Sequence, residues 1–182
     1  NAPHRIELEN GSSMKLEASE GKDAGMLYSV RAANLLNMAG ISVDQGFFPE
    51  DMDINLSSAE ENNSKSITFM EERGGIRDPT WMSNYHYNSG LIFEYRGHLN
   101  EAIFEYKDAL GFSEEGSNYT VQSMVVRARL SNALISTQDP QFFSEARDHY
   151  SHLVKYISEG GGFGVYDSLI KPILDKLKSR LE

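Results

Sequence analysis

The stretch "NSGLIFEYRGHLNEAIFEYKDAL", residues 88–110, contains two amphipathic segments on either side of Gly97. Apolar and aromatic residues recur at helical spacing in both segments, and a glycine between them is typical of a short turn. Small residues stand where two such helices would cross closely, at Gly90 on the first and Ala102 on the second. Tyr106 can then wedge between neighbouring helices, so the stretch predicts an antiparallel helical hairpin.

Composition describes a folded, acidic chain. Of its 182 residues, 40% are hydrophobic and 24% are charged, values close to those of ordinary globular proteins. The net charge of −10 argues against a protein that binds DNA or RNA, because such proteins neutralise phosphates with Lys and Arg. No apolar run approaches the roughly 20 residues that span a bilayer, so we expect a soluble domain.

The absence of cysteine excludes a disulfide framework, a thiolate nucleophile and a zinc–thiolate site. The chain opens with "NAPHRIEL" and no initiator Met, so we interpret Asn1 and Ala2 as a possible cloning remnant. Both a cytoplasmic location and export, with a targeting segment removed, stay open.

Helical period, caps and glycine stops divide the chain into expected elements. Residues 1–21 lack helical period and predict a flexible lead-in or a short strand. Residues 41–58 carry Gly, Pro and acids, and predict a long connection. The helices expected are 22–40, 57–73, 79–97, 100–110, 117–137, 140–158 and 166–182.

Two proline positions support helix starts, and a third suggests an interruption. Pro79 follows Asp78 and Pro140 follows Asp139, so each proline falls in a first helical turn behind a capping acid. Pro172 is expected to kink the last helix or split it in two. Because short turns join most helices and alternating strand patterns are scarce, we predict an all-α fold in one domain from residue 22 to residue 182.

The opening hairpin resembles the tetratricopeptide repeat, whose signature is W-x2-L-G-x2-Y followed by A-x3-F. The matching positions are Gly90, Phe93 in place of Tyr, Ala102, and Tyr106 in place of Phe, with Ala109 at the contact to the next unit. The signature's Trp, Leu and Pro are replaced by His86, Ser89 and Glu114.

A looser second copy runs through residues 127–136 and 144–154, and a third, weaker one covers 22–74. In the second copy the matching positions are Leu130, Ser131, Leu134, Ala146 and Tyr150. The resemblance therefore implies an α–α superhelix of about three irregular helix-turn-helix units, closed by a C-terminal capping helix.

The resemblance also implies a function: a non-catalytic module that binds a protein or peptide segment in a groove lined by the first helix of each unit, with no cofactor. Groove positions by this alignment are Asn84, Tyr87, Leu91, Glu94 and Tyr95. Some members hold a terminal carboxylate with Asn and Lys/Arg side chains. The matching clamp positions are Asn34, Asn88 and Arg129, while Val30 and Val125 stand where two lysines are expected.

Three alternatives remain open from the residues alone. His149 and His152 lie one helical turn apart near Glu145, an arrangement that could serve a metal-binding or catalytic helical bundle. The acidic segment 51–62 matches the first half of a calcium loop, with Asp51, Asp53, Asn55 and Ser57 at alternating positions, but lacks the glycine and bidentate Glu of its second half. The third alternative is an oligomerisation or assembly domain that uses the C-terminal helix, since the sequence leaves the oligomeric state undetermined.

Overall fold

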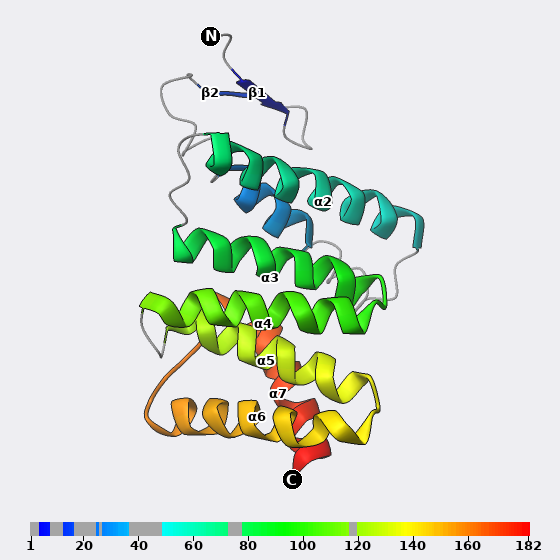
Figure 1. Ribbon diagram of the computed structural model, residues 1–182, viewed down its shortest axis with the longest axis vertical. Helices are drawn as coiled ribbons and strands as arrows, with labels where there is room; N and C mark the ends of the chain where they lie inside the picture. The colour runs from blue at the N-terminus through cyan, green and yellow to red at the C-terminus, as the bar shows by residue number, and fades with distance from the viewer. Residues whose placement is uncertain are drawn as a thin grey trace. The chain divides into compact units, whose positions relative to one another are not determined.

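The computed structural model of the chain describes residues 4–7, 13–16, 25, 27–36, 49–72, 78–116 and 120–182 (Figure 1). Two compact units make up the chain, residues 1–77 and residues 78–182. Apart from two four-residue strands, the regular structure of the described residues is helical, and sequence-adjacent helices pack antiparallel. The predicted all-α class, with antiparallel neighbouring helices, is confirmed.

The first unit contains a short hairpin of strands and two helical segments. Strands β1 (His4–Glu7) and β2 (Ser13–Leu16) pair antiparallel, with Ile6 opposite Met14. Residues 27–36 are helical, and α2 spans Pro49–Glu72. The rings of Tyr28 and Phe69 stack with centroids 5.5 Å apart, which joins the two helical segments through aromatic contact.

The start of α2 corrects the prediction of a long connection over residues 41–58. Helix α2 begins at Pro49 rather than near Ser57, because proline at a first helical position loses no hydrogen bond. Residues 51–62 are therefore helical and do not have the loop backbone that the match to a calcium loop requires.

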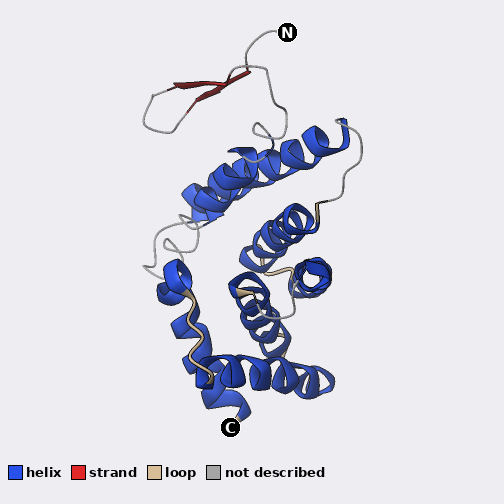
Figure 2. Ribbon diagram, turned by 90° about the vertical axis from the view of Figure 1, so that its left-hand side faces the viewer, coloured by secondary structure: helices blue, strands red, loops and turns tan. Residues whose placement is uncertain are grey.

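The second unit contains five α-helices. They are α3 (Pro79–Tyr95), α4 (Leu99–Gly116), α5 (Val121–Ser136), α6 (Phe143–Ser158) and α7 (Asp167–Leu181), with 3-10 turns η1 (Pro140–Phe142) and η2 (Gly164–Tyr166). Helices α3 and α4 form one hairpin and α5 and α6 a second, while α7 passes behind α5 in Figure 1. In Figure 2, α7 leads down to the C-terminus.

Two predicted helix starts, at Pro79 and Pro140, are confirmed, and in both an aspartate side chain caps the first turn. Asp78 accepts hydrogen bonds from the backbone N–H groups of Thr80 (2.9 Å) and Trp81 (3.3 Å), which confirms the cap before Pro79. Asp139 accepts one from the N–H of Gln141 at 3.0 Å. These caps satisfy backbone donors that have no partner within the helix.

A predicted helix end at Gly111 is wrong, and so is a split of the last helix at Pro172. Gly111 does not end α4, which continues to Gly116, since a glycine in a helix costs only about 1 kcal/mol relative to alanine. Pro172 does not split α7, which is a single helix from Asp167 to Leu181. Pro172 is exposed and lies early in the helix, and its missing N–H removes one backbone hydrogen bond.

The two hairpins of the second unit are tightly packed at their crossings. A Cβ atom built on Gly90 would lie 2.5 Å from Cε1 of Tyr106, so only glycine fits at that point of α3. In the other hairpin, the hydroxyl of Ser131 donates a hydrogen bond to the carbonyl of Ala146 at 2.6 Å. Residues 123–135 of α5 are all buried, which makes α5 the central helix of this unit.

Helix α7 covers part of α5 with one apolar stripe. The residues buried along it are Ile170, Ile173, Leu177 and Leu181, at helical spacing. The hydroxyl of Tyr150 on α6 donates to Glu182 at 3.0 Å and joins the end of α7 to the second hairpin. Among the helices that the structure describes, none has the length and apolarity needed to cross a bilayer.

Candidate partner-binding site

The predicted groove residues lie mainly on one helix. Helix α3 carries Asn84, Tyr87, Asn88, Leu91, Glu94 and Tyr95, whereas Arg129 lies on α5. Asn34 is exposed on the helical segment 27–36 of the other unit. The candidate site is therefore built from α3 and α5, with helices α4 and α7 contributing the side chains described below.

Glu94 is the centre of a polar cluster where α3, α4 and α5 meet. Its carboxylate accepts a hydrogen bond from the hydroxyl of Tyr106 at 2.5 Å and another from Nδ2 of Asn132 at 2.8 Å. Nη1 of Arg129 lies 3.7 Å from the same carboxylate. Because the Glu94 and Arg129 side chains are only 11% and 10% exposed, this ion pair is weakly screened by water.

Arg129 is buried but incompletely satisfied. The residue is 8% exposed, and its Nε has no hydrogen-bond partner among the described residues. The guanidinium lies 6.0 Å from the centre of the Tyr95 ring, a cation–π contact. A buried guanidinium donor without an acceptor is costly, and such groups commonly serve a ligand or an ordered water.

The surroundings of the cluster change how its groups ionise. Burial raises the pKa of Tyr87 to about 12, although Arg129 opposes the rise. Burial and the Glu94 carboxylate together raise the pKa of Tyr106 well above its usual value. Burial by itself would lower the pKa of Arg129, but Glu94 and the neighbouring tyrosines raise it well above its usual value. Both tyrosines are thus neutral and Arg129 is charged at neutral pH.

Lys176 on α7 extends the cluster, and it is a residue that the sequence reasoning missed. Its ammonium donates to Oδ1 of Asn132 at 2.8 Å and to the hydroxyl of Ser136 at 3.0 Å. Burial lowers the pKa of Lys176, an effect that Glu94 partly offsets. No local sequence pattern links positions 132 and 176, since only the packing of α7 across α5 brings them together.

Several predicted site residues are buried. Asn88 is 2% exposed and Leu91 is 4% exposed, so both are buried. Val125, a clamp position by the tetratricopeptide alignment, is fully buried in α5. The clamp as aligned does not assemble in the second unit, where Arg129 pairs with Glu94 and Asn34 belongs to the other unit.

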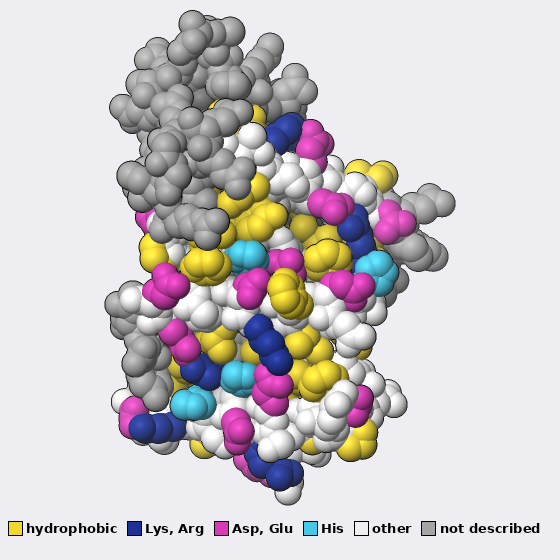
Figure 3. Space-filling model, viewed as in Figure 1, with side chains coloured by type: hydrophobic (Ala, Val, Ile, Leu, Met, Phe, Trp, Pro, Cys, Tyr) yellow, Lys and Arg dark blue, Asp and Glu magenta, His cyan; other side chains and the backbone are white. Residues whose placement is uncertain are grey.

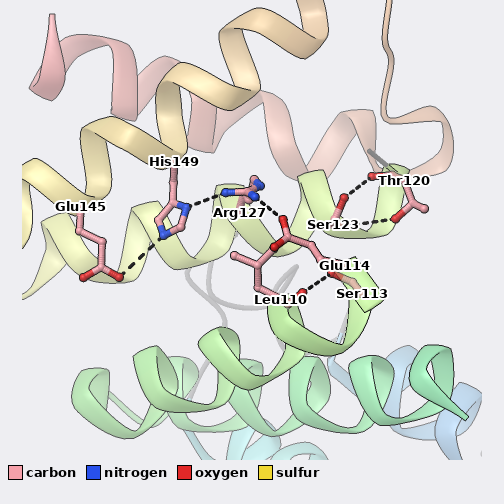
Figure 4. Close-up of polar contacts among 8 residues, drawn as sticks. All are labelled: Leu110, Ser113, Glu114, Thr120, Ser123, Arg127, Glu145 and His149. Carbon is pink, nitrogen blue, oxygen red and sulfur yellow. Dashed lines mark hydrogen bonds and ion pairs between the residues drawn. The ribbon is translucent and has the colours of Figure 1, made fainter. Parts of the chain in front are cut away.

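The histidine face that suggested a metal site belongs to a second polar cluster, between α4, α5 and α6 (Figure 4). Nη1 of Arg127 donates to Nδ1 of His149 at 3.0 Å, and Glu114 forms an ion pair with the same guanidinium. A guanidinium at the imidazole nitrogen opposes metal binding there. Within the described ranges, no group of three or more His, Asp or Glu side chains is placed to hold a metal ion.

An open hollow of about 480 Å³ lies at the turn side of both hairpins. It is lined by residues 97–101 of the first turn and by Thr137, Asp139, Gln141 and Phe142 of the second. None of the predicted site residues lines it. Over α4, α5 and α6, the face drawn in Figure 3 intermixes acidic, basic and histidine side chains.

Comparison with known proteins adds no relative to this description. No family model matches the chain, and neither a curated protein nor a solved structure matches it.

Proposed function

We propose that residues 78–182 form a small tetratricopeptide-like array that binds a protein or peptide segment, without catalysis of its own. The Arg129 guanidinium anchors a carboxylate of that segment, and Lys176 provides a second cation. This proposal is supported by the internal symmetry of the two hairpins, by the polar outer face of α7 and by the hydrogen-bonding state of Arg129.

The two hairpins share a set of equivalent relationships. Ala102 and Ala146 are both fully buried in the second helix of their hairpin. Tyr106 and Tyr150 follow them by four residues, and each donates its hydroxyl to a glutamate, Glu94 on α3 in one case and Glu182 after α7 in the other. Small residues stand at the crossing in both cases, Gly90 in one and Ser131 in the other. Repetition of the same packing in successive hairpins is the property that defines helical repeats.

Helix α7 has the character of a cap. Its exposed positions are Asp167, Ser168, Lys171, Pro172, Asp175, Lys176, Lys178, Ser179 and Arg180, which are polar apart from the proline. A terminal element with a polar outer face ends a repeat array in water, since a further repeat would need an apolar face to pack on.

Arg129 carries the proposal that the bound group is a carboxylate. The carboxylate of Glu94 lies 3.7 Å from Nη1, and among the described residues Nε has no hydrogen-bond partner. Arginine presents paired N–H donors that match the two oxygens of a carboxylate. The cluster holds two cations, Arg129 and Lys176, and one carboxylate, Glu94, so its net charge is +1. The chain as a whole has a net charge of −10.

Selection of peptides tests this function directly. A pool of random ten-residue peptides with free C-terminal carboxylates would be passed over the immobilised protein, and a second pool would carry C-terminal amides. We expect enrichment of sequences from the free-acid pool, or of acidic side chains in both pools, with micromolar affinity. Arg129→Met should abolish the enrichment, whereas Arg147→Met, which removes an exposed guanidinium from α6, should preserve it.

The outcomes separate this proposal from its alternatives. If Arg129→Met keeps its fold, as checked by circular dichroism, and enriches the same peptides, the binding site must lie elsewhere. If no peptide is enriched and light scattering shows a stable dimer, the function of the array is self-association and not peptide binding.

A further inference from the structure

We propose that the junction of α5 and α6 is an acid-sensitive latch, in which protonation of His149 places an imidazolium against the Arg127 guanidinium and releases α6. The proposal concerns a side-chain cluster that shares no residue with the Glu94 site, and it does not depend on the proposed function. Figure 4 draws four of its residues, Glu114, Arg127, Glu145 and His149.

The geometry requires a neutral His149. Nδ1 of His149 accepts a hydrogen bond from Nη1 of Arg127 at 3.0 Å, so this nitrogen must carry a lone pair and not a proton. The remaining proton then resides on Nε2, which lies 3.8 Å from Oε1 of Glu145. Protonation of Nδ1 would remove the only acceptor on the ring and set two N–H donors against each other.

The charges around His149 are already balanced without it. Helix α4 contributes Lys107, which pairs with Glu145 of α6 at 2.8 Å, and Glu114, which pairs with Arg127 of α5. Each carboxylate of the cluster is thus engaged by a permanent cation. A positive charge on His149 would be uncompensated and, because the His149 side chain is only 14% exposed, poorly solvated.

His152, one turn along α6, also disfavours a proton on His149. Burial lowers the pKa of His149 to about 4, with Arg127, His152 and Lys107 opposing protonation and Glu145 favouring it. When α6 separates from α5, the imidazole regains a pKa near 6.5. Acid therefore favours the separated state over the range between these two values, and stability is lost as the pH falls through it.

The first hairpin provides an internal contrast. There Nδ1 of His86 lies 2.9 Å from the carboxylate of Glu105. The same residue type is thus placed beside a carboxylate in α3–α4 and beside a guanidinium in α5–α6. The latch is therefore a feature of the second hairpin, where the ring nitrogen faces a cation.

Hydrogen exchange measured amide by amide tests the latch on the intact chain. Protection factors, corrected for the intrinsic pH dependence of exchange, would be compared at pH 7 and pH 5. From the pKa values above, opening of α6 should become about 20-fold more favourable at pH 5 than at pH 7. Amides of α4 that face α3 should change much less.

His149→Gln is the matched variant, because its side-chain oxygen can still accept from Arg127 without titrating. We expect its α6 amides to keep their protection between pH 7 and pH 5, while His152→Gln retains most of the wild-type loss. An imidazole titration of the wild-type protein by NMR gives a readout that requires no variant. A His149 pKa near 6.5, or an equal loss of protection in His149→Gln, would overturn the proposal.

Discussion

Tyr106 of α4 fills the space that a side chain on Gly90 of α3 would occupy, since a Cβ atom at that position would lie 2.5 Å from the tyrosine ring. The two residues are sixteen positions apart and lie on opposite helices of the first hairpin. The ring is fully buried and cannot swing into solvent, while its hydroxyl is held by Glu94. This contact fixes how closely α3 and α4 approach and joins the packing of the hairpin to the polar cluster.

Gly90→Ala should destabilise the protein by about 1–3 kcal/mol, the usual cost of forcing an extra group into a packed contact. The measurement is urea unfolding followed by circular dichroism. Gly111→Ala is the control, because Gly111 is exposed inside α4 and nothing lies within 4 Å of its added Cβ. That control should gain up to about 1 kcal/mol from helix propensity. Equal effects of the two substitutions would refute the close crossing.

Tyr106→Phe should cost about 1.5–3 kcal/mol, because it removes a buried hydrogen bond to a charged carboxylate. Tyr150→Phe removes an analogous hydroxyl whose acceptor is the side chain of Glu182, an exposed residue. We expect the second substitution to cost less than about 1 kcal/mol, since an exposed carboxylate regains water easily. The free energies of unfolding of both variants, measured in parallel, check this order.

Glu94 and Arg129 should show strong energetic coupling in a double-mutant cycle. Glu94→Gln leaves the Arg129 charge buried without a partner and should cost about 3 kcal/mol or more. Arg129→Met in the Glu94→Gln background should cost much less than in the wild-type background, giving a coupling of about 1–3 kcal/mol. Additive effects would show that the 3.7 Å pair contributes nothing specific.

Alkaline conditions should unfold the protein through its buried tyrosines. The pKa of Tyr87 is raised to about 12, above the ordinary value of 10. Its contribution to stability is therefore complete below pH 10 and lost as the pH rises towards 12. Tyrosinate absorbance should show late-titrating groups, and Tyr87→Phe should reduce the fall in urea midpoint between pH 9 and pH 11. A normal titration of every tyrosine would contradict the described burial.

Local signals in the sequence predicted most of the helices. The Asp78–Pro79 and Asp139–Pro140 pairs marked helix starts because a capping carboxylate and a proline act within a few residues of each other. The same local signals gave wrong predictions at Pro49, which was expected in a connection but begins a helix, and at Gly111, which was expected to end a helix but lies within one. Such residues permit a break without requiring it, so the packing around them decides the outcome.

The candidate site was predictable only in part. Spacing and the family resemblance selected Glu94, Tyr95 and Arg129, which do lie together. They could not reveal Lys176 or the burial of Asn88, because both depend on contacts between segments far apart in the chain. The Arg127–His149 contact was missed for the same reason, and an apparent metal face proved to be occupied by a guanidinium.

The most direct test of the central claim is an NMR titration of the isotope-labelled protein with a peptide selected from the free-acid pool. Amide shifts should concentrate on α3, α5 and α7 around Glu94, Arg129 and Lys176. The C-terminally amidated peptide, or Arg129→Met, should remove these shifts. Shifts confined to α4 and α6, or equal binding of the amidated peptide with no acidic side chain involved, would contradict this claim.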